Sequence, residues 1–205
     1  MIAPTLERES ALWAQGHEVV AGVDEVGRGP LAGPVIAAAV VFPPGQLPIE
    51  GLRDSKLLTR RQRDRAVLEV KSQAFAWTVG AASVKEIDKL NIRRATALAM
   101  RRALDSLPCS PDYVLIDGNP VPELGSSHEA IVKGDRVCQS IAAASVVAKC
   151  LRDHLMTLLA RRYPRFGWDS NKGYGTAAHL DALEEIGPSP HHRKSFSPVA
   201  QGRLF

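Results

Sequence analysis

The strongest constraint on the fold is a glycine- and proline-rich segment, residues 22–34, that lies between two apolar runs. Residues 17–25, which lead into it, are rich in β-branched side chains, and residues 35–42, which follow it, are almost entirely apolar. Short apolar runs bounded by turn residues are typical of strands. The first part of the chain is therefore predicted to supply two strands and the loop between them.

Three further strands are predicted, and helices are expected between and after them. Capping-box spacings begin at Thr59 and Ser83, and apolar residues recur at helical intervals from about residue 137. The predicted strands span residues 75–83, 113–116 and 130–132, and the predicted helices span residues 59–71, 83–106, 137–162 and 177–186.

This order of elements predicts an α/β fold with a mixed sheet flanked by helices. No linker separates two domains, so residues 1–205 are expected to form one domain, with a core over about residues 15–163 and a C-terminal helical extension and tail over about residues 164–205. The apolar fraction of 45% and the charged fraction of 23% are those of a soluble globular protein. The net charge of +4 is compatible with a polyanionic partner.

No targeting segment is evident in the sequence. The N-terminal residues include acids and lack an apolar core, and the longest apolar stretch, residues 31–44, is interrupted by glycine and proline. Cys109, Cys138 and Cys150 are odd in number and lack a Cys-x-x-Cys spacing, which favours reduced thiols. We therefore expect a cytoplasmic monomer with no membrane association, no disulfide framework and no zinc site.

Four acidic residues lie where regular structure is predicted to end: Asp24, Glu25, Asp117 and Asp135. Asp24 and Asp117 both follow apolar strand residues, and neighbouring strands would place them about 5 Å apart at one edge of the sheet. Adjacent side chains on a strand face opposite ways, so Glu25 shares this site only if the strand loses its regularity there. The two glycines that follow permit such a departure.

Clustered carboxylates repel one another and take up protons unless a divalent cation neutralises them. A ligand set of oxygen atoms alone favours Mg²⁺ or Mn²⁺, and two such ions about 4 Å apart can activate water for phosphodiester hydrolysis. An ordinary Asp-Gly turn at Asp117 and a helix cap at Asp135 are the structural alternatives.

The loop after the first two acids combines Gly27 and Gly29, which let backbone amides approach a ligand closely, with the cation of Arg28. Acids for a metal beside a loop for phosphate or sugar indicate nucleic-acid chemistry. A dinucleotide-binding fold is the competing interpretation, but a strand rather than a helix is predicted after this Gly-x-Gly.

With these residues considered together, the chain resembles the bacterial ribonuclease HII family over most of its length. The loop reads D-E-V-G-R-G-P-L-A-G-P over residues 24–34. Leu57 is one departure, since many relatives carry a second lysine there. The other matching motifs are D-S-K at residues 54–56, I-D-G at 116–118, K-G-D at 133–135, S-I-A-A-A-S-V-V-A-K at 140–149 and N-K-G-Y-G-T at 171–176.

The resemblance implies a ribonuclease H-like fold and an endoribonuclease that depends on Mg²⁺ or Mn²⁺. It implies hydrolysis of the RNA strand of RNA–DNA hybrids, and incision on the 5′ side of single ribonucleotides in duplex DNA that leaves a 3′-hydroxyl and a 5′-phosphate. The implied metal ligands and catalytic acids are Asp24, Glu25, Asp117 and Asp135. The implied substrate contacts are Gly27, Arg28 and Gly29 to the ribose 2′-hydroxyl, Lys56 to a phosphate and Tyr174 to the next sugar.

Other polar residues carry weaker signals. Ser140 and Ser145 are expected to pack tightly on a helix face or to support the acids. His179 is interpreted as structural, because only its nearness in sequence to Tyr174 suggests a further role. The basic residues at 161–172 are expected either to bind a duplex backbone or to remain solvated.

The last residues, Q-G-R-L-F, resemble the short peptide by which many bacterial DNA enzymes dock on the sliding clamp. Gln201, Leu204 and Phe205 are therefore expected to contact that partner.

Two other functions compete with the implied ribonuclease HII activity. A ribonuclease H-like nuclease for another substrate, such as branched DNA, is disfavoured by the Gly-Arg-Gly loop and Tyr174, and an inactive hybrid-binding protein is disfavoured by the four intact acids.

Overall fold

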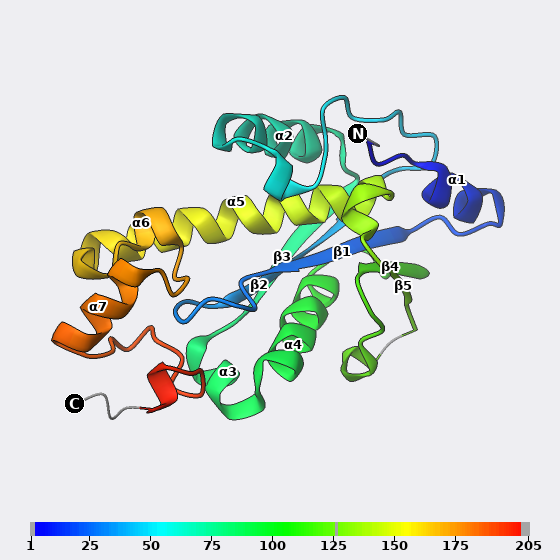
Figure 1. The fold of residues 1–205 in the computed structure, drawn as a ribbon. Coiled ribbons are helices and arrows are strands. Elements are labelled where there is room, and N and C mark those ends of the chain that lie inside the picture. The colour runs from blue at the N-terminus through cyan, green and yellow to red at the C-terminus, as the bar shows by residue number, and fades with distance from the viewer. Residues whose placement is uncertain (1–2, 126, 202–205) are drawn as a thin grey trace.

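The computed structural model describes residues 3–125 and 127–201 (Figure 1). Within them the sheet has five strands in the order β3-β2-β1-β4-β5. β1 and β3 each pair antiparallel with β2, whereas β4 pairs in parallel with both β1 and β5. The sheet is therefore mixed, which confirms the predicted fold class. The strands are β1 (Val20–Val26), β2 (Val35–Val41), β3 (Ala76–Ala82), β4 (Tyr113–Asp117) and β5 (Glu129–Ile131).

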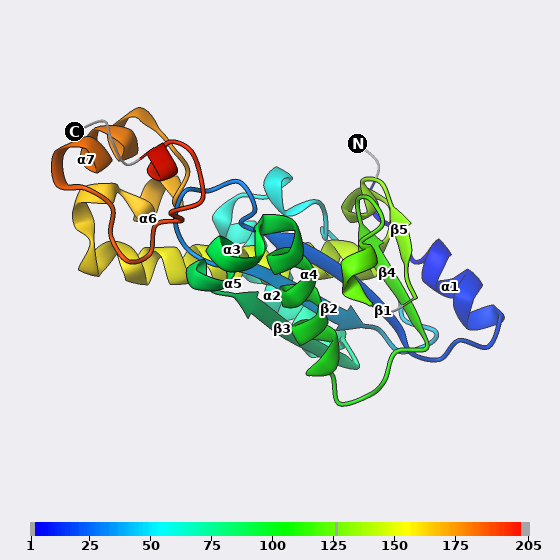
Figure 2. The same cartoon turned by 90° about the horizontal axis from the view of Figure 1, so that it is seen from below.

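Helices cover both faces of this sheet (Figures 1 and 2). α5 and α2 pack against one face and α4 packs against the other, while α6 and α7 gather at the C-terminal end of α5. The helices of the described residues are α1 (Glu7–Ala14), α2 (Arg60–Gln73), α3 (Val84–Leu90), α4 (Ile92–Asp105), α5 (Gln139–Arg162), α6 (Trp168–Asn171) and α7 (Ala177–Ile186).

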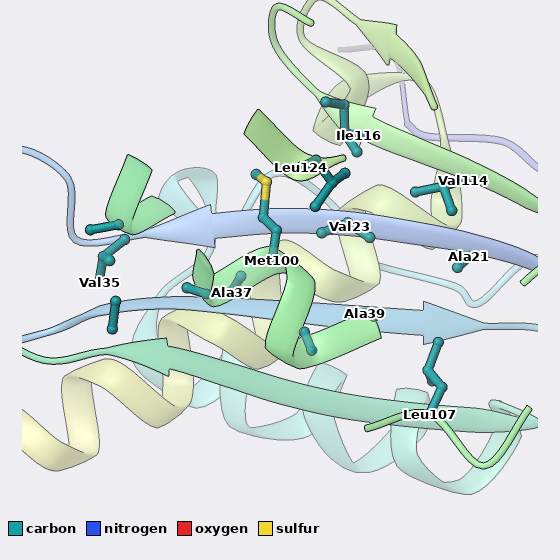
Figure 3. Packing of buried hydrophobic residues seen from close by; sticks show 14 of the residues in the cluster. Ala21, Val23, Val35, Ala37, Ala39, Met100, Leu107, Val114, Ile116 and Leu124 are labelled. Carbon is teal, nitrogen blue, oxygen red and sulfur yellow. The ribbon is translucent and has the colours of Figure 1, made fainter. Parts of the chain in front are cut away.

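Burial on both faces explains why residues 35–42 show no alternation of polar and apolar side chains. The odd-numbered residues of β2, among them Ala37 and Ala39, pack with Met100 of α4 (Figure 3). The even-numbered ones, such as Ala38, pack with the alanines and valines of α5. Small side chains on strand and helix allow a close approach, and this places the start of α5 beside the end of β1.

The helix predicted over residues 83–106 is in fact two helices, α3 and α4. Asn91 between them has a φ of 68°, a left-handed conformation that ends the first helix. The Asn91 side chain then accepts a hydrogen bond from Arg94 N and caps the second helix. The capping signal at Ser83 therefore predicted the start of α3 correctly, but the interruption within the predicted helix was missed.

The N-terminal region also differs from the prediction. The strand expected from residue 17 begins at Val20, because the two preceding amides donate to Asp112 Oδ2 instead of entering the sheet. α1 was not predicted from the sequence. Its buried Glu9 accepts hydrogen bonds from Ser140 N at 2.8 Å and Ser140 Oγ at 2.6 Å, so α1 caps the N-terminus of α5.

The cysteines are free thiols in this structure, and burial raises the pKa of Cys138 to about 12. Among the described helices, none combines the length and apolar character needed to cross a bilayer.

Candidate active site

Three carboxylates meet at the ends of the two central parallel strands. Asp24 of β1 lies one register step beyond the pair Val23 and Ile116, which places it opposite Asp117 of β4. Asp135 comes from the short 3₁₀ helix Gly134–Arg136 that precedes α5. One carboxylate oxygen of each acid lies within 4.8 Å of those of the other two. The structure thus brings together three of the four acids that the sequence singled out.

Burial makes this cluster costly to ionise. It raises the pKa of Asp24 well above its usual value, and the charges of Glu25 and Asp117 raise it further. Burial likewise raises the pKa of Asp135 to about 6, with additional contributions from Asp117 and Asp54. The cluster therefore takes up protons more readily than isolated carboxylates do unless a cation neutralises it, and its oxygen ligands are those that Mg²⁺ or Mn²⁺ prefers.

Glu25 lies beside this cluster and is not one of the three grouped acids. β1 keeps its regular pairing with β2 through Val26, so the strand does not lose its regularity at Glu25. The Glu25 carboxylate accepts a hydrogen bond from Arg28 Nη1 at 3.1 Å. Burial raises its pKa, Arg28 opposes that rise, and the charge of Asp117 adds to it. Glu25 therefore lies close enough to interact electrostatically with Asp117 although β1 stays regular, so a loss of regularity in the strand is not required to bring Glu25 beside the acids.

Close packing of β1 on α5 supports the acids. A Cβ atom at Gly22 would collide with the backbone and side chain of Ser140, so only glycine allows this approach. Ser145 on the same helix donates a hydrogen bond that stabilises the charged form of Asp24, whereas Ser140 serves Glu9. Of the two serines considered from the sequence, only Ser145 contacts an acid of the cluster.

A second segment, the 3₁₀ helix Ser55–Leu57, lies beside the cluster. Ser55 Oγ lies 3.0 Å from Ser145 Oγ. The buried Asp54 accepts hydrogen bonds from Lys56 N at 3.0 Å and from Arg136 Nη2 at 3.3 Å. The charge of Lys56 lowers the pKa of Asp135, so Lys56 places its cation near the acids. Asp54 was not identified as a site residue, because no strand leads into it.

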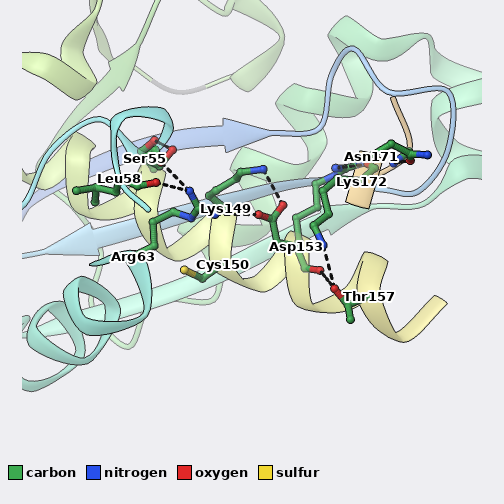
Figure 4. A network of polar contacts seen from close by, with 12 residues as sticks. Ser55, Leu58, Arg63, Lys149, Cys150, Asp153, Thr157, Asn171 and Lys172 are labelled. Atoms are coloured by element: carbon green, nitrogen blue, oxygen red, sulfur yellow. Dashed lines mark hydrogen bonds and ion pairs between the residues drawn. The ribbon is translucent and has the colours of Figure 1, made fainter. Parts of the chain in front are cut away.

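Polar contacts along α5 link this segment to the region before Tyr174 (Figure 4). Arg63 Nη1 donates to the carbonyl oxygen of Leu58 at 2.7 Å, and Asp153 accepts from Lys149 Nζ at 2.7 Å. Lys172 Nζ donates to Thr157 Oγ1 at 3.0 Å. Lys172, one of the basic residues noted in the sequence, therefore has partners within the chain.

The structure also brings the glycine loop and Tyr174 together. Gly27 has a φ of +93°, a conformation that favours glycine. A Cβ atom at Gly29 would lie 3.6 Å from Tyr174 Cε1, and Leu31 N donates to the carbonyl oxygen of Gly173 at 2.8 Å. Tyr174 is 48% exposed, so its ring is available to a ligand that lies on the loop.

His179 supports Tyr174 from below the surface, as a structural residue. Its Nδ1 lies 2.8 Å from the carbonyl oxygen of Tyr174, which can only accept, so Nδ1 carries the proton. Its Nε2 accepts from Trp168 Nε1 at 3.1 Å. Burial lowers the pKa of His179, which favours this neutral form.

Buried carboxylates that can hold divalent cations, beside a loop open to a ligand, are the kind of site at which metal-dependent nucleases hydrolyse phosphodiesters. Residues 21–199 match the family model described as Ribonuclease HII. The chain belongs to the ribonuclease HII family, which makes it a ribonuclease H-type endoribonuclease.

Relatives support this membership over nearly the whole chain. The ribonuclease HII of Cereibacter sphaeroides is 55% identical over 197 residues, which cover 96% of this chain and 92% of the relative. The ribonuclease HII of Paramagnetospirillum magneticum is 55% identical over 190 residues, which cover 91% of this chain and 94% of the relative.

Solved structures share the fold. Ribonuclease H2 from Pyrococcus horikoshii superposes with a TM-score of 0.73 at 25% identity, covering 89% of this chain and 96% of that one. Ribonuclease HII of Archaeoglobus fulgidus, solved in complex with PCNA, gives 0.71 at 22% identity and covers 87% of this chain and 95% of that one. Bst-RNase HIII, solved with Mn²⁺, gives 0.72 at 22% identity and covers 94% of this chain and 72% of that one.

Proposed function

We propose that this enzyme hydrolyses the RNA strand of RNA–DNA hybrids and incises duplex DNA on the 5′ side of a single ribonucleotide, leaving a 3′-hydroxyl and a 5′-phosphate. The observation that carries the proposal is the position of the exposed ring of Tyr174 close to Gly29, on the loop that directly follows Asp24 and Glu25. A ribose read at this contact would lie next to the acids.

The chemistry of the two surfaces suits a junction between RNA and DNA. The 2′-hydroxyl is the group that distinguishes a ribonucleotide from its deoxy neighbours, and backbone groups of residues 27–29 can hydrogen-bond to it at close range. A ring packed against the next sugar would clash with a 2′-hydroxyl there, so Tyr174 would select a deoxynucleotide by exclusion. Lys56, whose cation lies near the acids, would contact a phosphate of the substrate.

The acids fit a divalent cation. Asp24, Asp117 and Asp135 offer clustered oxygens, and Glu25 lies beside them, so these four residues would hold Mg²⁺ or Mn²⁺. When bound as a pair, such ions supply an activated water and stabilise the leaving oxygen in phosphodiester hydrolysis. The Mn²⁺ complex of Bst-RNase HIII, which shares this fold, supports the assignment. Hydrogen bonds from the buried Ser145 to Asp24 and from Arg28 to Glu25 keep the acids oriented.

The C-terminal peptide adds a proposed partner, the sliding clamp. Leu204 and Phe205 lie outside the described residues, as does the side chain of Gln201. The complex of Archaeoglobus fulgidus ribonuclease HII with PCNA supports clamp docking within this fold. Deletion of Leu204 and Phe205 should abolish binding to an immobilised clamp while leaving cleavage of short duplexes unchanged. Undiminished clamp binding would refute the proposal.

The proposed reaction is tested with a labelled DNA duplex that contains one ribonucleotide, an all-DNA duplex and an RNA–DNA hybrid. Each is incubated with the protein in Mg²⁺, Mn²⁺ or EDTA, and the cut is mapped at nucleotide resolution. We expect a metal-dependent cut 5′ to the ribonucleotide and no cut in the all-DNA duplex. Cleavage confined to the hybrid would overturn the assignment of a junction-reading role to Tyr174, and cleavage of the all-DNA duplex would favour another nuclease.

A further inference from the structure

Two arginines lie fully buried beneath the glycine loop. Arg152 of α5 and Arg193, which follows α7, are each 0% exposed. Within residues 3–125 and 127–201, neither has a carboxylate within salt-bridge distance. Burial lowers the pKa of Arg193 to about 9 and that of Arg152 to about 10, which leaves both charged at neutral pH. Burying a cation without a paired anion is costly, so the hydrogen bonds of these two side chains must offset that cost.

Arg193 directs its guanidinium at backbone carbonyls of the loop. Nη1 donates to Arg28 O at 2.8 Å, and Nη2 donates to Gly27 O. Nε and Nη2 both donate to Gly33 O, at 3.0 and 2.8 Å. Because the planar fork contacts carbonyls at both ends of the loop, it holds the loop in one shape. The loop is thus fixed by a residue about 160 positions later in the chain.

Arg152 extends this support to the segment that carries Tyr174. Its Nε donates to Pro34 O, its Nη2 to Ala32 O and its Nη1 to Lys172 O, each at 3.0 Å. A Cβ atom at Gly27 would collide with the Arg152 side chain, so the loop lies directly on this guanidinium. The same side chain therefore sets the position of the loop relative to the residues just before Tyr174.

The geometry of the peptide group gives these contacts a consequence for recognition. In a trans peptide the C=O of one residue and the N–H of the next point in opposite directions. Because the carbonyls of Gly27 and Arg28 point at Arg193, the amides of Arg28 and Gly29 point away from it. In the described part of the chain, neither of these two amides donates a hydrogen bond to a backbone carbonyl. They are therefore donors available to a ligand.

We propose that Arg193, with Arg152, is a positioning residue that aims the amides of Arg28 and Gly29 at the ribose and thereby sets the preference for a ribonucleotide. This inference rests on the proposed function. The competing view is that the two arginines only attach the C-terminal region to the core, where Leu31 and Ala32 of the loop pack with Trp168. Attachment alone would not distinguish a ribonucleotide from a deoxynucleotide.

The test compares binding of two duplexes that differ only in one 2′-hydroxyl, measured in EDTA so that no cleavage occurs. Arg193→Lys keeps the positive charge but lacks the fork that joins the carbonyls. We expect the ratio of the two dissociation constants to fall about tenfold toward one, while affinity for the all-DNA duplex changes less than about twofold. Arg101→Lys is the matched control, because Arg101 donates to the carbonyls of Glu123 and Leu124 outside the loop.

A folded Arg193→Lys variant that keeps the wild-type ratio, or that loses affinity for both duplexes equally, would overturn the inference. Thermal unfolding establishes whether the variant is folded. If it is not, Arg152→Lys takes its place in the same comparison, with a drop in the ratio of about threefold expected and an unchanged ratio again contradicting the inference. Absence of any preference in the wild type would contradict the proposed function, and with it this inference.

Discussion

The acid cluster and the glycine loop are neighbours in the chain, but the buried charges of the two regions have opposite signs. At the cluster, Asp24, Asp117 and Asp135 bring negative side chains together with few donors to satisfy them. Beneath the loop, Arg152 and Arg193 bring positive side chains together, and backbone carbonyls satisfy their donors. The first region is incomplete without a cation, whereas the second is complete within the protein.

This difference suits the two regions to different roles, hydrolysis at the cluster and recognition at the loop. A buried cluster of carboxylates whose charge a bound cation would neutralise is suited to chemistry, because it exchanges stability for reactivity. A loop whose peptide groups are held by buried guanidinium forks is suited to recognition, because its donors keep a fixed direction. A substitution in one region should therefore leave the role of the other region intact, and the predictions below test that separation.

The largest effect is expected at the cluster. Asp24→Asn removes a proposed metal ligand and should reduce cleavage by roughly 10³-fold or more, as measured by single-turnover assays in saturating Mg²⁺. Asp112→Asn is the control, because Asp112 serves as an acceptor for amides at the opposite end of β1 and should leave cleavage nearly unchanged. Substantial cleavage by Asp24→Asn would show that the cluster takes no part in the reaction.

A smaller and more selective effect is expected at Tyr174. Tyr174→Ala should reduce cleavage at a single ribonucleotide by about 10- to 100-fold, if packing of a sugar on the ring contributes as much as the roughly 1–3 kcal/mol of a base stacked on a ring. Cleavage of long hybrids, measured in parallel, should fall much less. Tyr174→Phe retains the ring and should behave like the wild type. Equal losses on both substrates would show that the ring does not read the junction.

Stability should depend on pH in the direction set by the cluster. Folding raises the pKa of Asp135 from 3.8 to about 6, so the folded metal-free protein binds more protons than the unfolded chain between these values. The free energy of unfolding in EDTA should therefore decrease by about 1–3 kcal/mol as the pH rises from about 4 to about 6. Urea unfolding of the wild type and Asp135→Asn measures this, and an identical slope in both would contradict it.

The smallest effect is expected outside both regions, at the cap of α5. Glu9→Ala removes the acceptor for two donors of Ser140 and should lower the free energy of unfolding by about 1–2 kcal/mol. Glu9→Gln retains an acceptor oxygen and should cost less. Chemical denaturation of the three proteins provides the measurement. A change in ribonucleotide preference in Glu9→Ala would contradict the expectation that this cap affects stability alone.

The sequence predicted the acid cluster better than the support of the loop. Asp24 and Asp117 follow apolar runs, and strand geometry alone brings such residues to one edge of a sheet. The functions of Arg193 and Glu9 depend on carbonyls and amides more than 130 residues away, and no local pattern signals those partners. The break at Asn91 was missed for a related reason, since it depends on one residue in the left-handed region.

The central claim is that chemistry and ribose reading are separable, and one set of paired measurements tests it most directly. For the wild type, Asp24→Asn and Arg193→Lys, cleavage of a single-ribonucleotide duplex is measured across a Mg²⁺ titration, which also gives the apparent metal affinity. The ribose preference in binding is measured in EDTA. The account predicts that Asp24→Asn loses cleavage and keeps the preference, whereas Arg193→Lys loses the preference and keeps its divalent-metal affinity. Loss of the preference in Asp24→Asn, with its retention in Arg193→Lys, would contradict the account.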